Sequence, residues 1–407
     1  MHVRQGTGHY VERRRVIDTT AVAIAAAALA LMFVGATLPT PLYPLYREAF
    51  GFSGITLTLI YAVYVLGNMA ALFTFGRLSD QIGRRRVSLV ALSIGLASTL
   101  VFAFASGTPW LFAARMISGF STGLGAGAVT AWITELLPAC GKSGSAQIAT
   151  VANYAGLALG AAITGLVAEF VNWPLRLPYW IYLVLLLAIV IGCTFAPETV
   201  RNPNRNLSAL SLRPRVGVPQ AIRLQFVPPA VTAFAVFSLL GFYAALIPNL
   251  LAESLHQSSP VTSGAVMCEL FAVAGIAVIF TSKLSSRVAM LSGLALLVPS
   301  LWLLVAAEAV QSLPLLLGAT VLGGISGALG YRGSLAVVNG IAPVDQRSEI
   351  VSSYLVAVYS GNSVPVVGIG LLSAVTNSAV AHVALAILIT FLTAIAFAVA
   401  TRNADFT

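Results

Sequence analysis

Long apolar runs separated by short polar segments make up most of the chain. A helix needs about 20 apolar residues to cross the ~30 Å hydrocarbon core of a bilayer. Twelve segments are of this order of length, at approximately residues 19–44, 53–76, 87–106, 109–137, 146–170, 177–196, 227–252, 262–281, 288–307, 314–341, 350–373 and 378–401. Because backbone groups in lipid must be satisfied within their own segment, the pattern predicts an all-α membrane protein with twelve transmembrane helices.

The composition excludes an ordinary soluble protein. Hydrophobic residues account for 58% of the chain and charged residues for 9%, against roughly 25% charged residues in a soluble domain. The mean hydropathy of +0.92 applies to all 407 residues, so the apolar excess is not confined to one anchor. We therefore expect the lipid bilayer to surround most of the surface.

The net charge of +9 reflects where Lys and Arg lie along the chain. If the N-terminus is cytoplasmic, all but four of the 22 Lys and Arg residues fall in cytoplasmic segments; Arg47 and Arg176 lie in outer loops, and Arg115 and Arg332 lie within spans. This is the positive-inside distribution. It predicts a multi-pass protein of the cytoplasmic (inner) membrane with both termini cytoplasmic, and it explains the basic charge without a nucleic-acid partner.

The longest polar interruption divides the chain into two related halves. It covers residues 201–226 and separates six spans from six. Ser53-Gly54 and Tyr61-Ala62-Val63 in the second span return as Ser263-Gly264 and Phe271-Ala272-Val273 in the eighth. Such repeats predict two pseudo-symmetric six-helix bundles. We expect an N-terminal bundle with its cytoplasmic tail at 1–200, a cytoplasmic loop at 201–226 and a C-terminal bundle at 227–407.

The loop after the second span carries a specific motif. It reads Gly76-Arg77-Leu78-Ser79-Asp80-Gln81-Ile82-Gly83-Arg84-Arg85-Arg86. The two glycines allow a tight turn between helices, and an acid among cations can pair with them or meet a helix N-terminus. The segment resembles the G-x-L-x-D-R-x-G-R-R/K signature of the major facilitator superfamily, with Gln81 where Arg is usual. This resemblance implies the major facilitator fold and transport by alternating access.

Other segments extend the resemblance. Gly35, Pro41 and Pro44 resemble the G-x5-P-x2-P motif of the twelve-helix drug/proton antiporter branch. Further similarities to the superfamily are Leu111, Arg115 and Gly119; Glu135 with Lys142; and Pro197-Glu198-Thr199. The fifth span departs from the antiporter motif, because Ala161 stands where that motif has proline.

Charged residues at the cytoplasmic ends of the spans are candidates for a gate. In the superfamily such groups form a network that closes in the outward-facing state and breaks when the halves rock apart. The resemblance implies this role for Gly76, Asp80, Gly83, Arg84, Arg85, Glu135, Lys142 and Glu198, with Arg287 and Arg347 as partners from the C-terminal half. Exposed ion pairs contribute only ~0–1 kcal/mol each, which suits a switch that opens repeatedly.

Polar side chains within the spans have two interpretations. Tyr61, Tyr64 and Asn68 share one face of the second span. They could line a substrate cavity or form hydrogen bonds between helices, and the same alternatives hold for Asn153, Tyr243, Asn249, Arg332, Tyr359 and Asn362. Gly119, Gly123 and Gly127 in the fourth span are expected to let it pack closely against a neighbouring helix.

Glu269 is the candidate proton carrier, with Arg115 assisting from the other half. A charge at the centre of a membrane helix costs ~2.5–3.5 kcal/mol on insertion scales, so each is a functional candidate. Glu269 is the only carboxylate well inside a predicted span, and the first span has no acid. His382 lies near the outer end of the last span, and we expect no role for it.

These features together predict a secondary active transporter. Gly141-Lys142-Ser143 mimics the end of a P-loop, but Leu136 occupies the position of the required first glycine, so we expect no ATP site. The three cysteines lack metal-ligand spacing, and we expect no cofactor and no metal. The leading hypothesis is proton-coupled efflux of a small drug-like or amphiphilic compound. The alternative is uptake or facilitated transport of a polar solute such as a sugar or organic acid.

A hypothesis of another class is an intramembrane serine hydrolase. Gly361-Asn362-Ser363 resembles a G-x-S element, and His382 is a conceivable base. Twelve spans and a gating loop have no role in simple proteolysis. We therefore expect a transporter and no enzyme.

Overall fold

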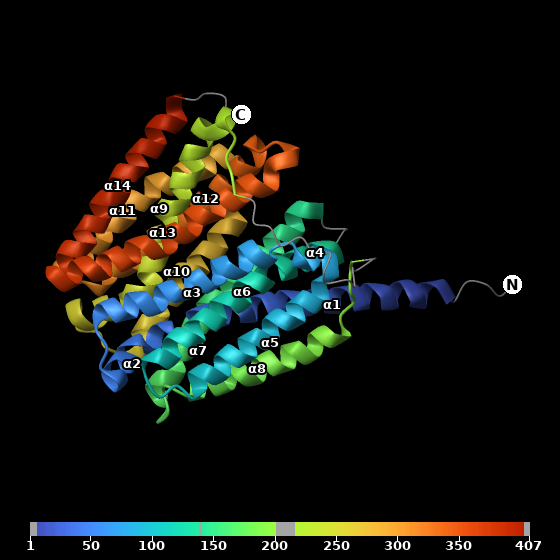
Figure 1. Ribbon diagram of the computed structural model, residues 1–407, viewed down its shortest axis with the longest axis horizontal. Coiled ribbons are helices and arrows are strands. Elements are labelled where there is room, and N and C mark those ends of the chain that lie inside the picture. Colours follow the sequence, from blue (N-terminus) through green and yellow to red (C-terminus); the bar gives the residue numbers. More distant parts are fainter. Residues whose placement is uncertain (1–5, 138–140, 201–215, 403–407) are drawn as a thin grey trace.

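The computed structural model describes residues 6–137, 141–200 and 216–402, without the side chains of 6–18, 141–143, 344 and 402. Its described residues form helices and no strand (Figure 1). The long helices are α1 (Gly6–Thr37), α3 (Gly54–Phe75), α5 (Arg84–Ala103), α6 (Thr108–Leu136), α7 (Gly141–Phe170), α8 (Leu177–Phe195), α9 (Arg223–Asn249), α10 (Pro260–Phe280), α11 (Ser286–Ala309), α12 (Leu313–Ile341), α13 (Arg347–Val375) and α14 (Ser378–Arg402). Within the described chain, twelve helices are long and apolar enough to cross a membrane, so the predicted fold class is confirmed.

Two spans are longer than hydropathy predicts. The first reaches Phe50 because α1 is followed by a short 3-10 turn (η1, Thr40–Leu42) and a short helix (α2, Tyr43–Phe50). Pro41 and Pro44 lie in the first turns of η1 and α2, where their missing N–H groups leave no bond unmade. The seventh begins at Gln220, seven residues before its predicted start, because polar Arg223 and Gln225 lower the mean hydropathy of its first turns.

The helices form two six-helix bundles with matching packing. In the first, α3 and α5 both pack on α6, and α1 packs on α7; in the second, α10 and α11 both pack on α12, and α9 packs on α13. The bundles lie side by side, blue to green and yellow to red (Figure 1). The domain boundaries themselves stay a prediction, because residues 201–215 lie outside the described chain.

Equivalent hydrogen bonds repeat this pseudo-symmetry. Ser121 donates to the Ala91 carbonyl at 2.7 Å, and Ser326 in the second bundle donates to the Gly293 carbonyl at 2.8 Å. Each bond joins the two helices α6 and α5, or α12 and α11, at corresponding positions. The same arrangement in both halves supports an origin of the fold in a repeated six-helix unit.

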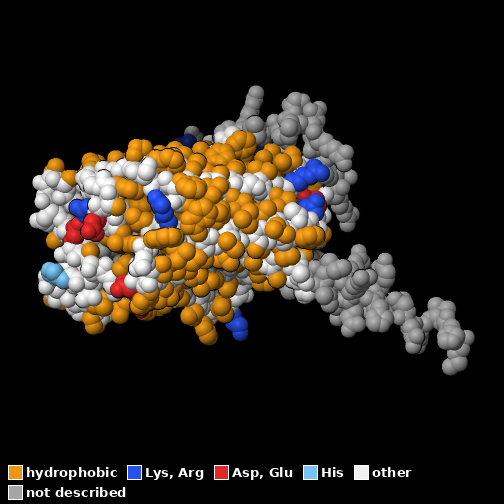
Figure 2. All heavy atoms as spheres, turned by 90° about the horizontal axis from the view of Figure 1, so that it is seen from below, with side chains coloured by type: hydrophobic (Ala, Val, Ile, Leu, Met, Phe, Trp, Pro, Cys, Tyr) orange, Lys and Arg blue, Asp and Glu red, His pale blue; other side chains and the backbone are white. Residues whose placement is uncertain are grey.

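The outer surface of the bundles is apolar. Figure 2 shows hydrophobic side chains over most of the visible face between its two ends. Large apolar side chains such as Phe195, Phe280 and Val375 are about four-fifths exposed. A contiguous apolar surface of this extent is unfavourable in water and is expected for contact with lipid.

Glycines determine how closely α6 approaches α3. A Cβ at Gly119 would overlap the Tyr64 carbonyl oxygen, and one at Gly123 would overlap the Asn68 carbonyl oxygen. A Cβ at Gly127 would meet no atom within 4 Å. The expected close packing therefore involves Gly119 and Gly123, and the prediction for Gly127 is wrong because this position is exposed and faces no neighbouring helix at contact distance.

The two bundles contact each other mainly through α7 with α10 and α3 with α13. Gly165 of α7 and Gly264 of α10 face each other, so that a Cβ on either would approach the other helix's backbone. Ala161, which stands where the antiporter motif has proline, presents its carbonyl oxygen to Gly264. The contact between α3 and α13 brings Tyr61 of one half next to Asn362 of the other.

Candidate functional site

The helix bundles have two ends with different polar groups. The motif end carries the turn 76–86 and the ends of α6 and α8 near Glu135 and Glu198. The opposite end carries α2 and a π-helical turn, η5 (Leu250–Ser254), which continues α9.

At the motif end, Arg84 is the centre of an ion-pair network. Its guanidinium group pairs with Asp80 on the short helix α4 (Leu78–Ile82) and with Glu135 at 2.9 Å, and Nη1 donates to Ser79 Oγ at 2.7 Å. Thr199 donates to the second oxygen of Glu135. The network thereby joins the ends of α4, α5 and α6 and the segment after α8, all within the N-terminal half.

Glu198 caps the start of α5. Its Oε1 accepts the backbone N–H of Arg84 at 2.8 Å, where the helix dipole favours a negative charge. Gly83 precedes this position with φ = 117°, a conformation that favours glycine. The acid that meets the helix N-terminus is therefore Glu198, while Asp80 pairs with a side chain.

A hydrogen bond joins the two halves at the motif end. Arg77 Nη2 donates to Ser348 Oγ on α13 at 2.9 Å. Arg287 donates to the Ala400 carbonyl within its own half, and Arg347 is exposed at the first residue of α13. The Lys142 side chain lies outside the described residues. Arg85 donates to the Ala196 carbonyl at 3.0 Å. Pairing of the C-terminal arginines with the gate acids thus stays a prediction for a state in which this end is closed.

Arg115 is fully buried within the N-terminal half. Its Nε bonds to the Tyr43 hydroxyl at 3.0 Å and its Nη1 to the Ala36 carbonyl at 2.9 Å. The guanidinium carbon lies 5.1–5.8 Å from the ring centres of Tyr43, Tyr61 and Tyr64, so cation–π attraction adds to these bonds. No carboxylate in the described chain lies within ion-pair distance of Arg115. Aromatic rings and carbonyl dipoles therefore stabilise the charge.

Tyr61 joins the site across the two halves. Its hydroxyl donates to Asn362 Oδ1 on α13 at 3.0 Å. Asn68 is buried, and its Oδ1 has no hydrogen-bond partner among the described residues. Tyr243 shares a hydrogen bond of 3.0 Å with Thr320. Tyr61, Asn362 and Tyr243 thus bond between helices, while Asn68 retains a free acceptor.

The remaining candidates occupy different surroundings. Tyr359 packs against the apolar cluster that both halves share, and Asn153 and Asn249 are half-buried. Arg332 donates to the Leu284 carbonyl at 3.1 Å, between α10 and α11. This bond therefore holds the Arg332 side chain within the C-terminal half.

Three further tyrosines that are buried or half-buried, Tyr154, Tyr331 and Tyr354, were not among the predicted cavity residues. Tyr331 stacks with Tyr354 at 6.5 Å between ring centres and meets Phe237 edge-on at 5.3 Å. Tyr154, from the N-terminal half, is buried in the apolar cluster that both halves share and faces Gly275 of α10. Hydropathy does not separate a tyrosine at a cavity from one in the core, so the sequence did not single these residues out.

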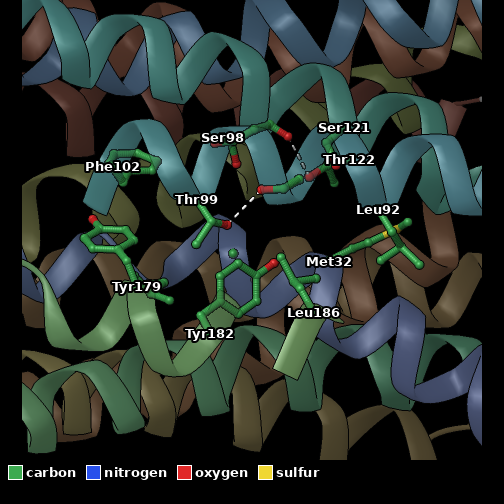
Figure 3. Close-up of a pocket in the computed structure, with 14 residues that line it drawn as sticks. Met32, Leu92, Ser98, Thr99, Phe102, Ser121, Thr122, Tyr179, Tyr182 and Leu186 are labelled. Carbon is green, nitrogen blue, oxygen red and sulfur yellow. Dashed lines mark hydrogen bonds between the residues drawn. The ribbon is translucent and has the colours of Figure 1, made fainter. Parts of the chain in front are cut away.

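A small hydroxyl-lined cavity lies inside the N-terminal half (Figure 3). Ser98, Thr99, Thr122 and Tyr182 surround it together with apolar side chains of α1, α5 and α8. Its volume of about 20 Å³ suffices for roughly one water molecule. It is far smaller than the ~300 Å³ or more of a site for a drug-sized ligand.

Glu269 lies on α10, as predicted, but not beside Arg115. It is half-buried on the arc of α10 that also carries exposed Ala265, Ala272 and Ile276. Its Oε2 is buried and accepts no hydrogen bond from the described residues. Arg115 makes its bonds to Tyr43 and Ala36 instead. The structure therefore keeps the two proposed coupling residues apart.

A buried acid–histidine pair was not foreseen. His382 Nδ1 lies 2.7 Å from Glu308 Oε2, with the two side chains 6% and 7% exposed. Glu308 Oε1 accepts from Ser254 Oγ at 2.9 Å. Ser363 donates to the Tyr359 carbonyl of its own helix at 2.9 Å. The nucleophile and base of the hydrolase hypothesis thus have other partners.

Comparisons with known proteins agree with this architecture. The family model described as Major Facilitator Superfamily matches residues 25–289, more than half of the chain. The quinolone resistance protein NorA of Staphylococcus aureus is 28% identical over 150 residues, which are 37% of this chain and 38% of NorA. An uncharacterized transporter of Rickettsia bellii is 31% identical over 183 residues, 43% of each chain. The chain thus matches less than half of the length of these relatives.

Solved structures share the fold over nearly the whole chain. A bacterial homologue of the human lysosomal transporter Spinster, inward-facing and unoccupied, matches with a TM-score of 0.73 at 15% identity, covering 95% of this chain and 97% of that one. A peptide transporter with bound sulfate matches with a TM-score of 0.77 at 11% identity, covering 96% and 95%. At these identities the likeness concerns the fold alone.

Proposed function

Because the chain belongs to the Major Facilitator Superfamily, we propose that it exports a drug-like or amphiphilic compound in exchange for protons, by alternating access of its two bundles. The chain is a membrane transporter of small molecules and not an enzyme. The proposal covers the direction of transport, the class of substrate and the coupling ion. It includes a location in the cytoplasmic membrane with the motif end facing the cytoplasm.

The observation that carries the proposal is the unequal joining of the halves at the two ends. At the opposite end, Arg47 pairs with Glu253, Ser259 donates to Glu169 at 2.7 Å, and Thr40 donates to the Ala244 carbonyl at 3.1 Å. All three contacts cross between bundles. At the motif end, the ion pairs among the described side chains remain within one bundle, and one hydrogen bond, from Arg77 to Ser348 at 2.9 Å, crosses between bundles. This asymmetry fits a state closed at the opposite end, which rocking of the bundles would reverse.

The aromatic surroundings of the interface favour an amphiphilic substrate. Tyr61 and Tyr64 from one half and Tyr331 and Tyr359 from the other supply large apolar faces with hydroxyl groups at their edges. Such side chains hold flat or amphiphilic molecules through apolar contact and a few hydrogen bonds. NorA, a relative of part of the chain, is a quinolone resistance protein.

Proton coupling is assigned to Glu269, with Arg115 responding to substrate. One carboxyl oxygen of Glu269 is buried and accepts no hydrogen bond from the described residues, so a proton on that oxygen would displace no partner. Water that reaches α10 in the other state would allow the proton to leave. Arg115 has no acid partner in the described chain and would attract an anionic or electron-rich substrate group.

Transport into inside-out membrane vesicles tests this proposal. A panel of labelled compounds, including a fluoroquinolone, a lipophilic cation, a sugar and an organic acid, is offered with the vesicle interior acidic or at equal pH. We expect accumulation of an amphiphilic compound that needs the acid interior. Accumulation of a sugar or organic acid without dependence on the pH gradient would favour the facilitated pathway and overturn efflux by antiport.

A further inference from the structure

The π-helical turn η5 holds one side of the closed opposite end. Glu253 in this turn pairs with Arg47 of α2, which joins the C-terminal and N-terminal halves. Both side chains are substantially exposed, at 53% and 37%. An exposed pair of this kind contributes little by itself, so its geometry depends on how firmly η5 is held.

Two buried side chains, Glu308 and His382, support η5 through its half-buried Ser254. Ser254, the neighbour of Glu253, donates to Glu308 at the end of α11 at 2.9 Å, and Glu308 bonds to His382 on α14 at 2.7 Å. The His382 ring meets Phe242 of α9 edge-on at 4.9 Å between ring centres. The relay Ser254–Glu308–His382 therefore links three helices of the C-terminal half to the turn that carries Glu253.

We propose that the Glu308–His382 pair binds a proton and thereby positions η5, so that acidity at the opposite end of the protein favours closure of that end. Glu308 and His382 act through Ser254 and Glu253 and are positioning residues. The inference rests on alternating access, but it does not depend on efflux or on Glu269 as the carrier.

The sign of the effect follows from the charges. Histidine exchanges protons near neutral pH. With His382 protonated, the pair is neutral overall and its hydrogen bond is charge-assisted. With His382 neutral, the Glu308 carboxylate remains as a buried charge without a cation, which is strongly destabilising. Low pH should therefore stabilise the relay, hold η5 in place and favour the Arg47–Glu253 contact.

Few other titratable groups lie near the pair. The π-turn carries Glu253 and α2 carries Arg47 and Glu48, all outside the pair itself. On α9 the titratable residues are Arg223, in its first turn, and Tyr243, which bonds to Thr320. On α12, which packs against α11, they are Tyr331 and Arg332, both far from its first residue Leu313. The titratable residues of α13 within the described side chains are Arg347, Glu349, Tyr354 and Tyr359, none in its last four turns. His256, just after η5, is an exposed histidine and requires its own control.

The test measures the opposite end without any substrate. The full-length chain, with Cys140, Cys193 and Cys268 replaced, is spin-labelled at exposed Ala49 and Ser258 and placed in nanodiscs. Distance distributions are recorded at about pH 5.5 and about pH 8, which bracket histidine titration. We expect the closed-to-open ratio to be roughly fivefold or more higher at the lower pH, a typical coupling between sites.

Matched variants separate the relay from general effects of pH. Glu308→Gln and His382→Gln should remove the pH dependence, and Ser254→Ala should remove it while leaving the pair intact. His256→Gln should keep it. An unchanged pH response in Ser254→Ala or Glu308→Gln, loss of the response in His256→Gln, or no response in the parent protein would overturn the proposal. If Glu308→Gln does not fold, the pH response of Ser254→Ala tests the proposal. This response is measured without substrate, so failure of proton-driven efflux would not change it.

Discussion

The carboxylate of Glu198 fills the space into which a Cβ at residue 83 would project. Gly83 adopts φ = 117°, and Glu198 accepts the N–H of Arg84 at 2.8 Å. The glycine of the motif thus serves two purposes, since it permits the turn and leaves room for the acid that caps α5. Sequence spacing explains the turn, whereas the cap depends on an acid more than a hundred residues away.

Gly83→Ala should therefore impair the gate more than an ordinary turn mutation. The matched control is Gly51→Ala, because Gly51 also has positive φ (66°) but has no atom within 4 Å of a Cβ. Backbone strain costs about 1–2 kcal/mol at Gly51, which lies in the left-handed helical region, and about 1–3 kcal/mol at Gly83, whose φ of 117° and ψ of 143° lie near a region that is almost restricted to glycine. Only Gly83→Ala must also displace Glu198. Thermal unfolding and transport of the purified variants should show a larger loss for Gly83→Ala, and equal losses would contradict the cap.

Asp80→Asn should reduce transport with little loss of stability. Asp80 is 57% exposed and pairs with Arg84, and such a pair contributes ~0–1 kcal/mol. Loss of ~1 kcal/mol from one state of the gate changes its population by about fivefold. The control is Asp345→Asn, an exposed acid just before α13. Initial transport rates at equal expression should fall for Asp80→Asn alone, and parental rates would remove Asp80 from the gate.

Gly123→Ala should destabilise the protein, whereas Gly127→Ala should not. Replacing glycine by alanine within a helix favours the helix by about 1 kcal/mol. At Gly123 this gain is offset by overlap with the Asn68 backbone on α3, and at Gly127 no atom lies within 4 Å. Fluorescence-detected gel filtration after heating provides the comparison. Equal stability of the two variants would show that α3 and α6 can separate without cost.

Glu269→Gln should abolish proton-driven accumulation while leaving substrate exchange intact. The glutamine cannot gain or lose a proton, but it preserves the size of the side chain. Glu48→Gln, at an exposed acid on α2, is the control and should behave like the parent protein. Counterflow and pH-driven uptake are measured in the same vesicles. Full pH-driven uptake by Glu269→Gln would exclude Glu269 as the carrier.

The spans could be predicted because hydropathy reports directly on contact with lipid. The bend after α1 could not be placed from hydropathy alone, since Pro41 and Pro44 interrupt the helix without interrupting the apolar run. The gate role of the acids stays a prediction from the family resemblance, and the sequence did not indicate the partners that the structure shows. Arg84 pairs within its own half, and Arg287 bonds to Ala400.

The contact between Glu308 and His382 could not be predicted from the sequence. Glu308 lies one residue beyond the predicted end of its span, and His382 follows it by 74 positions. Their contact depends on the rotation of α11 and α14 about their axes. A nearly uniform apolar helix gives no periodic signal for that rotation, because lipid and protein interior are similarly apolar.

Proton movement driven by a gradient of the transported compound tests proton-coupled efflux. Proteoliposomes containing the protein and an internal pH-sensitive dye receive a gradient of a transported compound at equal pH on both sides. We expect the compound moving down its gradient to drive protons in the opposite direction. Glu269→Gln should abolish this proton movement but not exchange of the compound. Movement of the compound by the parent protein with no change in internal pH would contradict proton-coupled efflux.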